Sequence, residues 1–186
     1  MKKLAFLMML VAAMAASAEI KVGTVDMMLL VRNHPNYDSN KALLTSTDKD
    51  YQKKLESVKA EGDKLQEDGK KLMEQMRNPM LTAKAKADVE RELGDIQQKL
   101  IAMEQRYRSE AMRCRQDLQD LEGRLLKTTT DDLRKRLAAY AKKTGYDFIY
   151  DVTAVPYAKP DYDVTNEMLR ELGVDPKDAK GRDEGK

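Results

Sequence analysis

The sequence predicts a mainly α-helical protein with a small β body, an α+β fold in which a long antiparallel coiled-coil hairpin projects from a short-stranded oligomerisation domain. Three observations predict this fold. The 186-residue chain is 35% charged and contains no Trp and two Phe, which leaves few large residues for a thick core. Apolar residues recur with heptad spacing over most of the chain. Runs of β-branched and aromatic residues are confined to the two flanks of that pattern.

The amino terminus has the plan of a cleavable secretory signal. Lys2 and Lys3 precede an uncharged apolar run that starts at Leu4 and ends in small residues at Ala18. This run is shorter than the roughly 20 residues that a helix needs to span a bilayer. We therefore expect residues 1–18 to be a signal peptide cleaved after Ala18, and a retained membrane anchor is the weaker alternative.

Removal of this signal leaves a formally neutral mature chain. The 34 basic and 32 acidic residues become equal in number because Lys2 and Lys3 leave with the signal. Residues 70–143 carry a basic excess, whereas the segments on either side are acidic. A solvated helix face is the simpler interpretation of that excess. Weak attraction to a membrane surface or to acidic partners, which salt would reduce, is the alternative.

The first strand and the first long helix follow the signal. Residues 20–26 are rich in β-branched side chains and predict a short strand. Residues 39–77 contain no proline and predict a helix whose seam is spaced four and three residues apart. That seam comprises Leu44, Tyr51, Leu55, Val58, Gly62, Leu65, Gly69, Leu72 and Met76. We expect its two glycines to let a partner backbone approach closely.

A second and longer helix follows the break at Asn78-Pro79, where proline ends the first helix. Thr82 can cap it, and Gly145 stops it. Its seam comprises Val89, Leu93, Ile96, Leu100, Met103, Tyr107, Ala111, Cys114, Leu118, Leu121 and Leu125. Residues 39–143 therefore predict one antiparallel hairpin with its tip near 77–82. Because the arms are unequal, the excess of the second must pack on the rest of the chain or on another copy.

The carboxyl-terminal flank predicts two more strands, at 147–151 and 152–158, and then a short helix. Thr165 is its expected cap, and Val164 and Leu169 are placed as a hydrophobic staple. Gly173 is its expected stop. Residues 174–186 are charged, nearly free of apolar groups, and expected to be disordered.

Residues 19–38 and 144–173 thus form a discontinuous β-rich body. Three short strands give too little core for a secure domain of this size, so we expect copies of the chain to share a core. The candidate oligomerisation residues are Val22, Val25, Phe148, Ile149, Tyr150, Val155, Val164 and Leu169.

The order of these elements resembles a known family. The informative motifs are Val25-Asp26-Met27, His34-Pro35-Asn36-Tyr37, Tyr146-Asp147-Phe148-Ile149-Tyr150-Asp151, Ala154-Val155-Pro156-Tyr157 and Asp163-Val164-Thr165. With the charged hairpin between them, the mature chain up to Gly173 resembles the Skp family, also called OmpH-like proteins. The motifs in the flanks carry the likeness, because charged hairpins occur in many unrelated proteins.

The resemblance implies a periplasmic chaperone that holds unfolded outer-membrane β-barrel proteins and needs no ATP. It further implies a homotrimer whose helical arms surround a cavity. The neutral mature chain departs from the better-studied members, which are distinctly basic. This difference puts binding of lipopolysaccharide or anionic lipid in doubt here.

Apolar residues at the hairpin tip are the candidate client-binding site. They are Leu72, Met73, Met76, Met80 and Leu81. Methionine is flexible and polarizable, which suits a surface that meets many sequences. The alternative interpretation, weighed equally, is that these residues only close the seam and cover the turn.

Catalysis is not expected. His34 is the sole histidine and lies in a turn, where we expect a turn or surface role, and no metal-ligand spacing accompanies it. Cys114 is the only cysteine and is expected in the seam. Asp147 and Asp151 flank a strand without a nucleophile, which favours roles at the strand ends. No phosphate loop, cofactor or metal motif is found, nor a basic aromatic motif for nucleic acid. A structural spacer of the cell envelope remains the alternative function.

Overall fold

The computed structural model describes residues 20–181 and confirms the predicted fold class. Two long helices account for most of these residues, and two short strands form the only sheet among them. The described chain divides into a hairpin unit, residues 38–127, and a body unit, residues 20–37 with 128–181. The predicted signal peptide, residues 1–18, and the last part of the predicted tail, residues 182–186, lie outside the described range.

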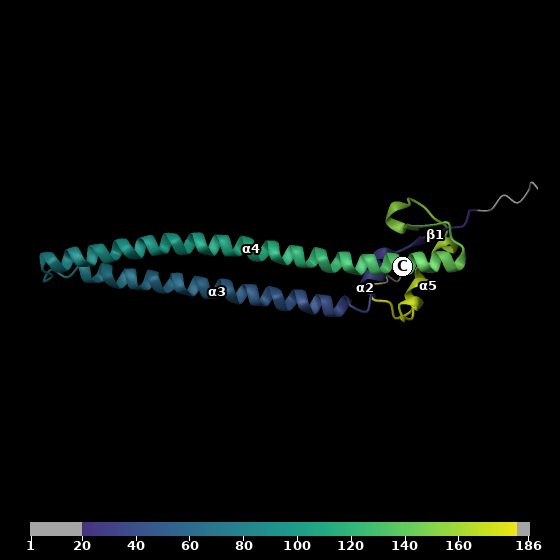
Figure 1. Ribbon diagram of the computed structural model, residues 1–186. Helices are drawn as coiled ribbons and strands as arrows, with labels where there is room; N and C mark the ends of the chain where they lie inside the picture. Colours follow the sequence, from purple (N-terminus) through teal and green to yellow (C-terminus); the bar gives the residue numbers. More distant parts are fainter. Residues whose placement is uncertain (1–19, 182–186) are drawn as a thin grey trace, which may run out of the picture. The chain divides into compact units, whose positions relative to one another are not determined.

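Helices α3 (Tyr37–Met76) and α4 (Ala83–Thr144) form the predicted hairpin. Within the hairpin unit they run side by side in opposite directions (Figure 1). Every predicted seam position in both helices is buried or half-buried except Tyr107, which is 39% exposed. The heptad spacing therefore identified the paired faces of both helices.

Both ends of α4 lie where the capping and stop residues in the sequence predicted them. The amide of Ala85 donates to Thr82 Oγ1 at 3.3 Å, so Thr82 caps the first turn as predicted. Gly145 follows the last helical residue with φ of +74°, a conformation that costs glycine little, and it ends the helix as expected.

The sheet of the body is parallel and two-stranded. Strands β1 (Val22–Val25) and β2 (Phe148–Asp151) pair with Val22 opposite Phe148 and Val25 opposite Asp151. Two of the three predicted strands, those at 20–26 and 147–151, are thus confirmed in position. The edge of β2 away from β1 has no partner strand among residues 20–181.

The third predicted strand, at 152–158, is wrong. Residues Val152–Ala154 form a 3₁₀ turn, η2, and a second such turn, η3, spans Pro160–Tyr162. Asp151 Oδ1 accepts hydrogen bonds from both the amide and the hydroxyl of Thr153, at 2.9 and 2.8 Å. A short aspartate side chain thereby offers the backbone a local partner in place of a strand ladder.

A short helix that the sequence analysis missed, α2, spans Met27–Arg32. Asp26 caps it, because its Oδ1 accepts from the amide of Leu29 at 2.8 Å. Its Leu29 and Leu30 are buried in the body. The signal was present as an aspartate followed directly by an apolar run.

The last helix, α5, spans Thr165–Glu171, and its predicted cap is wrong. Thr165 lies inside the first turn, and Val164 takes the cap position without a side-chain bond. The Oγ1 atom of Thr165 instead accepts from the amide of Asp26 at 2.9 Å, which ties α5 to the end of β1. Gly173 ends the helix as predicted, with φ of +80°.

Residues 174–181 are placed against the body, which differs from the predicted disordered tail. Asn33 Oδ1 accepts from the amide of Lys180 at 2.8 Å, and its Nδ2 donates to the carbonyl of Lys180 at 3.1 Å. Pro176 is buried, and Ala179 packs on the core. Composition alone predicted disorder because it cannot show that the side-chain amide of Asn33 supplies the segment with backbone partners.

The core of the body draws on all of its elements. It comprises Val25, Leu29, Leu30, Leu133, Val164, Met168, Leu169 and Leu172. Leu133 comes from the base of α4, where Leu137 and Tyr140 pack alongside it. Full burial of a Leu or Met side chain contributes roughly 2 kcal/mol. The excess length of α4 therefore packs on the chain itself, one of the two alternatives that its length left open.

Candidate protein-binding surfaces

The hairpin tip divides the five candidate client-binding residues into two groups. Met73 is 55% exposed and Met80 is 87% exposed. Leu72, Met76 and Leu81 are half-buried. In the turn, Asn78 Oδ1 accepts from the amide of Met80 at 3.0 Å, which fixes the backbone beneath this side chain. The tip thus presents two methionines to solvent, whereas the other three candidates are also packing residues.

Two open cavities notch the surface of the hairpin unit beside the seam glycines. The first, of about 330 Å³, is lined mainly by apolar groups around Gly62, including Val58, Met103 and Tyr107. The second, of about 470 Å³, surrounds Gly69 and includes Met73, Leu93 and Ile96. Gln66 and Leu100 line both cavities, so the two are neighbours along the hairpin. We call this surface the notched groove.

The expected role of the two glycines is wrong. A Cβ built on Gly62 would lie 3.5 Å from Cγ of Met103, and one on Gly69 would lie 3.4 Å from Cγ2 of Ile96. No backbone atom of the facing helix lies within 4 Å of either position. The glycines therefore leave space beside the seam and do not serve a close approach of two backbones. Sequence reasoning missed the groove, although its signal was the pair of seam glycines.

Ion pairs cross the hairpin and join its two helices. Lys54 of α3 pairs with Glu110 of α4, and Arg106 of α4 pairs with Glu61 of α3 at 3.0 Å. The hydrogen bond between the side chains of Lys54 and Glu110 raises the pKa of Lys54 and lowers the pKa of Glu110. These exposed pairs contribute little stability but favour the observed alignment of the helices.

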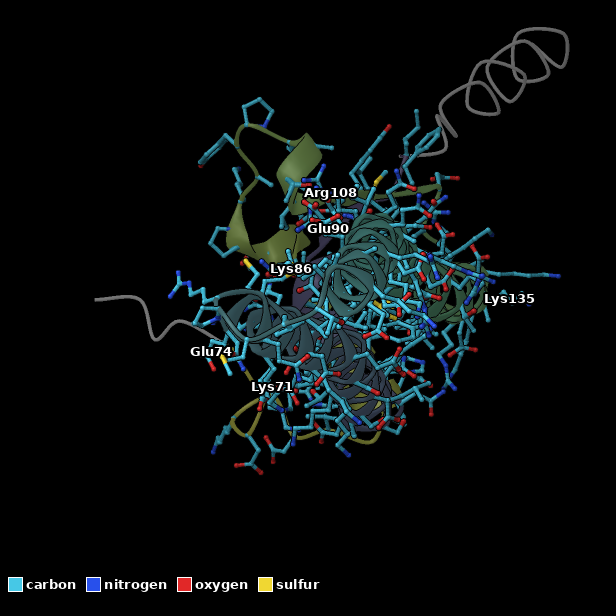
Figure 2. The ribbon with its side chains drawn as sticks, turned by 90° about the vertical axis from the view of Figure 1, so that its left-hand side faces the viewer. Lys71, Glu74, Lys86, Glu90, Arg108 and Lys135 are labelled. Carbon is cyan, nitrogen blue, oxygen red and sulfur yellow. The ribbon has the colours of Figure 1, made fainter. Side chains whose placement is uncertain are left out.

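Other charges pair within one helix and point to solvent. Lys71 lies 2.8 Å from Glu67 in α3, and Arg108 pairs with Glu104 in α4. Figure 2 shows Lys71 and Glu74 of α3 directed outward from the ribbon. This arrangement agrees with the interpretation of the charged residues as solvated helix faces.

The body presents an exposed aromatic face beside β1. An open cavity of about 530 Å³ lies there, lined by Val22, Tyr150, Val155, Tyr157, Tyr162 and neighbouring residues. Tyr157 is 79% exposed, and the stacked rings of Phe148 and Tyr150 are about half exposed. Exposed apolar surface gathered around a cavity is typical of an interaction site.

The structure separates the eight candidate oligomerisation residues. Val25, Val164 and Leu169 are buried in the core of the body, so they stabilise a single copy. Ile149 packs against the same core. Val22, Phe148, Tyr150 and Val155 lie at or beside the aromatic face and are half-buried or exposed. Tyr157 and Tyr162, which were not among the candidates, belong to this face as well.

His34 lies in the turn after α2, which agrees with the predicted turn or surface role, but its side chain is not at the surface. Its side chain is buried, and Nε2 lies 3.0 Å from Oδ2 of Asp132. Its Nδ1 accepts from the amide of Asn36 at 3.2 Å, so the neutral ring carries its proton on Nε2. Arg136 Nε donates to the same Asp132 oxygen at 2.7 Å. These hydrogen bonds, from Arg136 first and His34 second, lower the pKa of Asp132.

The remaining candidates for chemistry have structural roles. Cys114 is buried in the seam as predicted. Asp147 Oδ2 accepts from the amide of Lys21 at 2.8 Å at the start of the sheet, and Asp151 caps η2. Among residues 20–181, no group of three or more His, Cys, Asp or Glu side chains is arranged to hold a metal ion. Within the same range, no helix has both the length and the apolar character needed to cross a membrane.

These features define a protein with a long helical hairpin and with apolar side chains exposed on both of its units. A family model described as "Outer membrane protein (OmpH-like)" matches residues 21–172, and the chain belongs to this family. The match runs from β1 through α5. The OmpH-like family consists of periplasmic chaperones for outer-membrane proteins, which are not enzymes. No curated protein matches the chain.

Proposed function

We propose that the mature protein is an ATP-independent periplasmic holdase. Three copies assemble through their bodies, and their hairpins surround a cavity. Unfolded outer-membrane β-barrel proteins are held in that cavity and are kept from aggregating until they reach the membrane.

The exposed aromatic face of the body is the observation that carries this proposal. Tyr150, Tyr157 and Tyr162 line an open apolar cavity, and Phe148 stacks on Tyr150 at its side. Next to them, β2 has a strand edge without a partner strand in the described chain. Exposed apolar surface and an open edge are both stabilised when another copy covers them. Assembly is the first requirement of a cavity between arms.

Client holding then rests on many weak contacts. Met73 and Met80 at the tip and the notched groove along the hairpin offer apolar surface without a deep pocket. Contacts repeated over three hairpins raise the total affinity through effective concentration. No single contact needs to be strong, so a holdase of this kind can accept and release many sequences.

An aggregation assay tests the proposal. A urea-unfolded outer-membrane β-barrel protein is diluted into buffer with and without the mature chain, with no ATP, and turbidity is followed. We expect a molar excess of trimer to suppress aggregation, and light scattering to give the mass of three chains. Full aggregation of the client at excess protein contradicts a holdase and favours the structural spacer.

A further inference from the structure

The notched groove has a length and spacing that suit a short polypeptide segment. Its lining residues in α3 run from Val58 to Met73, which at 1.5 Å per residue is about 22 Å. Gly62 lines one notch and Gly69 the other, and the two glycines are one heptad apart, which is about 10.5 Å along the same face of α3. The groove therefore offers two recesses in line and at a fixed distance.

Neither glycine is needed by the hairpin itself. Both lie within the helical span of α3 and neither has a positive φ. An added Cβ at either position would make ordinary van der Waals contact with Met103 or Ile96. Alanine at each site would improve helix propensity by about 1 kcal/mol. The glycines therefore cost helix stability at positions where a larger residue would fit, and each leaves its notch wider by one side chain.

The lining has the chemistry of a site for an uncharged segment of polypeptide. Apolar side chains form most of each notch, and the charged residues on the rims, Lys59, Asp63, Lys70 and Glu104, balance to zero. The carboxamides of Gln66 and Gln97 line the groove and are able to donate to and accept from peptide groups. A balanced rim gives no attraction to a polyanion such as nucleic acid or an anionic lipid surface.

We propose that the notched groove binds an unfolded polypeptide segment in the polyproline II conformation, with apolar side chains three residues apart in its two notches. Polyproline II has three residues per turn and rises 3.1 Å per residue, so residues i and i+3 project to the same side about 9.3 Å apart. In a β-strand, same-side residues recur about 6.7 Å apart, which does not match the notches. A polyproline II segment therefore matches the spacing of the two glycines, about 10.5 Å, more closely than a β-strand does. This inference rests on the proposed holdase function and identifies where and how the client is held.

Peptide binding tests the spacing. Two fluorescent peptides of identical composition carry three leucines, either at every third or at every second position, with proline and serine elsewhere so that neither forms a helix. Anisotropy is measured with the full mature chain. We expect the three-residue spacing to bind about tenfold more tightly, which corresponds to about 1.4 kcal/mol. Equal affinities, or tighter binding of the two-residue spacing, overturn the proposal.

Filling the notches tests the site. We expect Gly62→Ala with Gly69→Ala to raise the thermal midpoint and to lower affinity for the peptide with leucine at every third position about threefold. Leucine at both glycine positions should lower that affinity about tenfold. Gly94→Ala with Gly123→Ala is the matched control, because a Cβ at either position of α4 contacts nothing within 4 Å. The control is expected to gain stability and keep full affinity.

The outcomes separate this inference from the holdase function. Suppose that the unchanged protein suppresses client aggregation, and that the alanine and leucine variants bind the peptide as tightly as the unchanged protein. The groove is then not the client site, and only this inference fails. If the unchanged protein neither binds peptide nor suppresses aggregation, the holdase function itself is contradicted. Circular dichroism confirms that each variant keeps its helical content. The alanine pair remains decisive should the leucine pair fail to fold.

Discussion

At the scale of single residues, His34 links two parts of the body that are far apart in the sequence. It lies in the turn after α2, and its buried ring bonds to Asp132 in the base of α4. Nδ1 of the same ring accepts a hydrogen bond from the amide of Asn36. Both ring nitrogens are thus satisfied, as a buried polar group requires.

Removal of this ring should destabilise the body. His34→Ala leaves a cavity and deprives the amide of Asn36 of its acceptor, so we expect the free energy of unfolding to fall by about 2 kcal/mol. Urea denaturation at a fixed protein concentration measures the loss. Lys135→Ala, a change at an exposed position of α4, the helix that carries Asp132, serves as the control and should alter stability by less than about 0.5 kcal/mol. A His34→Ala variant as stable as this control would contradict the structural role.

Asp132 adds a dependence on pH. Because Arg136 and His34 hold its pKa below the ordinary value, the carboxylate contributes stability that is complete above the unfolded pKa. This contribution is lost as the pH falls through the lowered folded pKa, below about pH 4. We expect the unfolding midpoint in urea of Asp132→Asn to lie below that of the unchanged protein at pH 7, and the gap to narrow as the pH falls toward 3. A gap that widens on acidification would refute this sign.

At the scale of elements, the hairpin tip combines a hydrogen-bonded turn with exposed methionine side chains. Asn78 closes the turn through its bond to the amide of Met80, so the tip backbone does not depend on the methionine side chains. Met76 is half-buried and belongs to the seam, whereas Met73 and Met80 are mostly exposed. A test of the tip should therefore change only the exposed pair.

Serine at both positions should reduce client binding without unfolding the hairpin. We expect Met73→Ser with Met80→Ser to shorten the retention of an unfolded barrel client about threefold, with helicity near normal, because apolar contacts are lost at solvent-facing sites. Retention is read from the dissociation rate of a fluorescent client. Met112→Ser is the matched control, since Met112 is 75% exposed on α4 but lies outside the tip. Equal retention by all three proteins would remove the tip from the mechanism.

At the scale of the whole molecule, the body has a hydrophobic core of its own. Its buried core includes residues from β1, α2, α4 and α5, and is larger than three short strands would provide. A single copy therefore has its own core, and the exposed aromatic face remains for association. In the proposed assembly, copies that are already folded cover each other's aromatic faces. They do not need one another to complete a common core.

Polar substitutions on this face should lower the assembled mass. We expect Phe148→Ser with Tyr150→Ser to shift the mass found by light scattering from three chains toward one, because association then loses the stabilisation that comes from burying two apolar aromatic rings. Met28→Ser is the control, since Met28 is an exposed apolar residue of α2. An unchanged mass in the double variant would place the assembly surface elsewhere.

The hairpin was predictable because its signals are local. Heptad spacing, the Asn78-Pro79 break, the Thr82 cap and the Gly145 stop each depend on residues within a few positions of one another. The motifs in the flanks were sufficient to identify the OmpH-like family, which the match over residues 21–172 confirms. Of the candidate site residues, the exposed tip methionines and the aromatic pair of β2 lie on the surface as their proposed roles require.

The tertiary structure decided the features that depend on contacts distant in sequence. Burial of His34 requires Asp132, 98 residues away, and the placement of residues 174–181 requires the side chain of Asn33, 147 residues from Lys180. The notched groove exists only because both glycines face apolar side chains of the other helix. Periodicity in one chain identifies which face of a helix is paired. It does not give the space left between two paired faces, because that space depends on side chains from both.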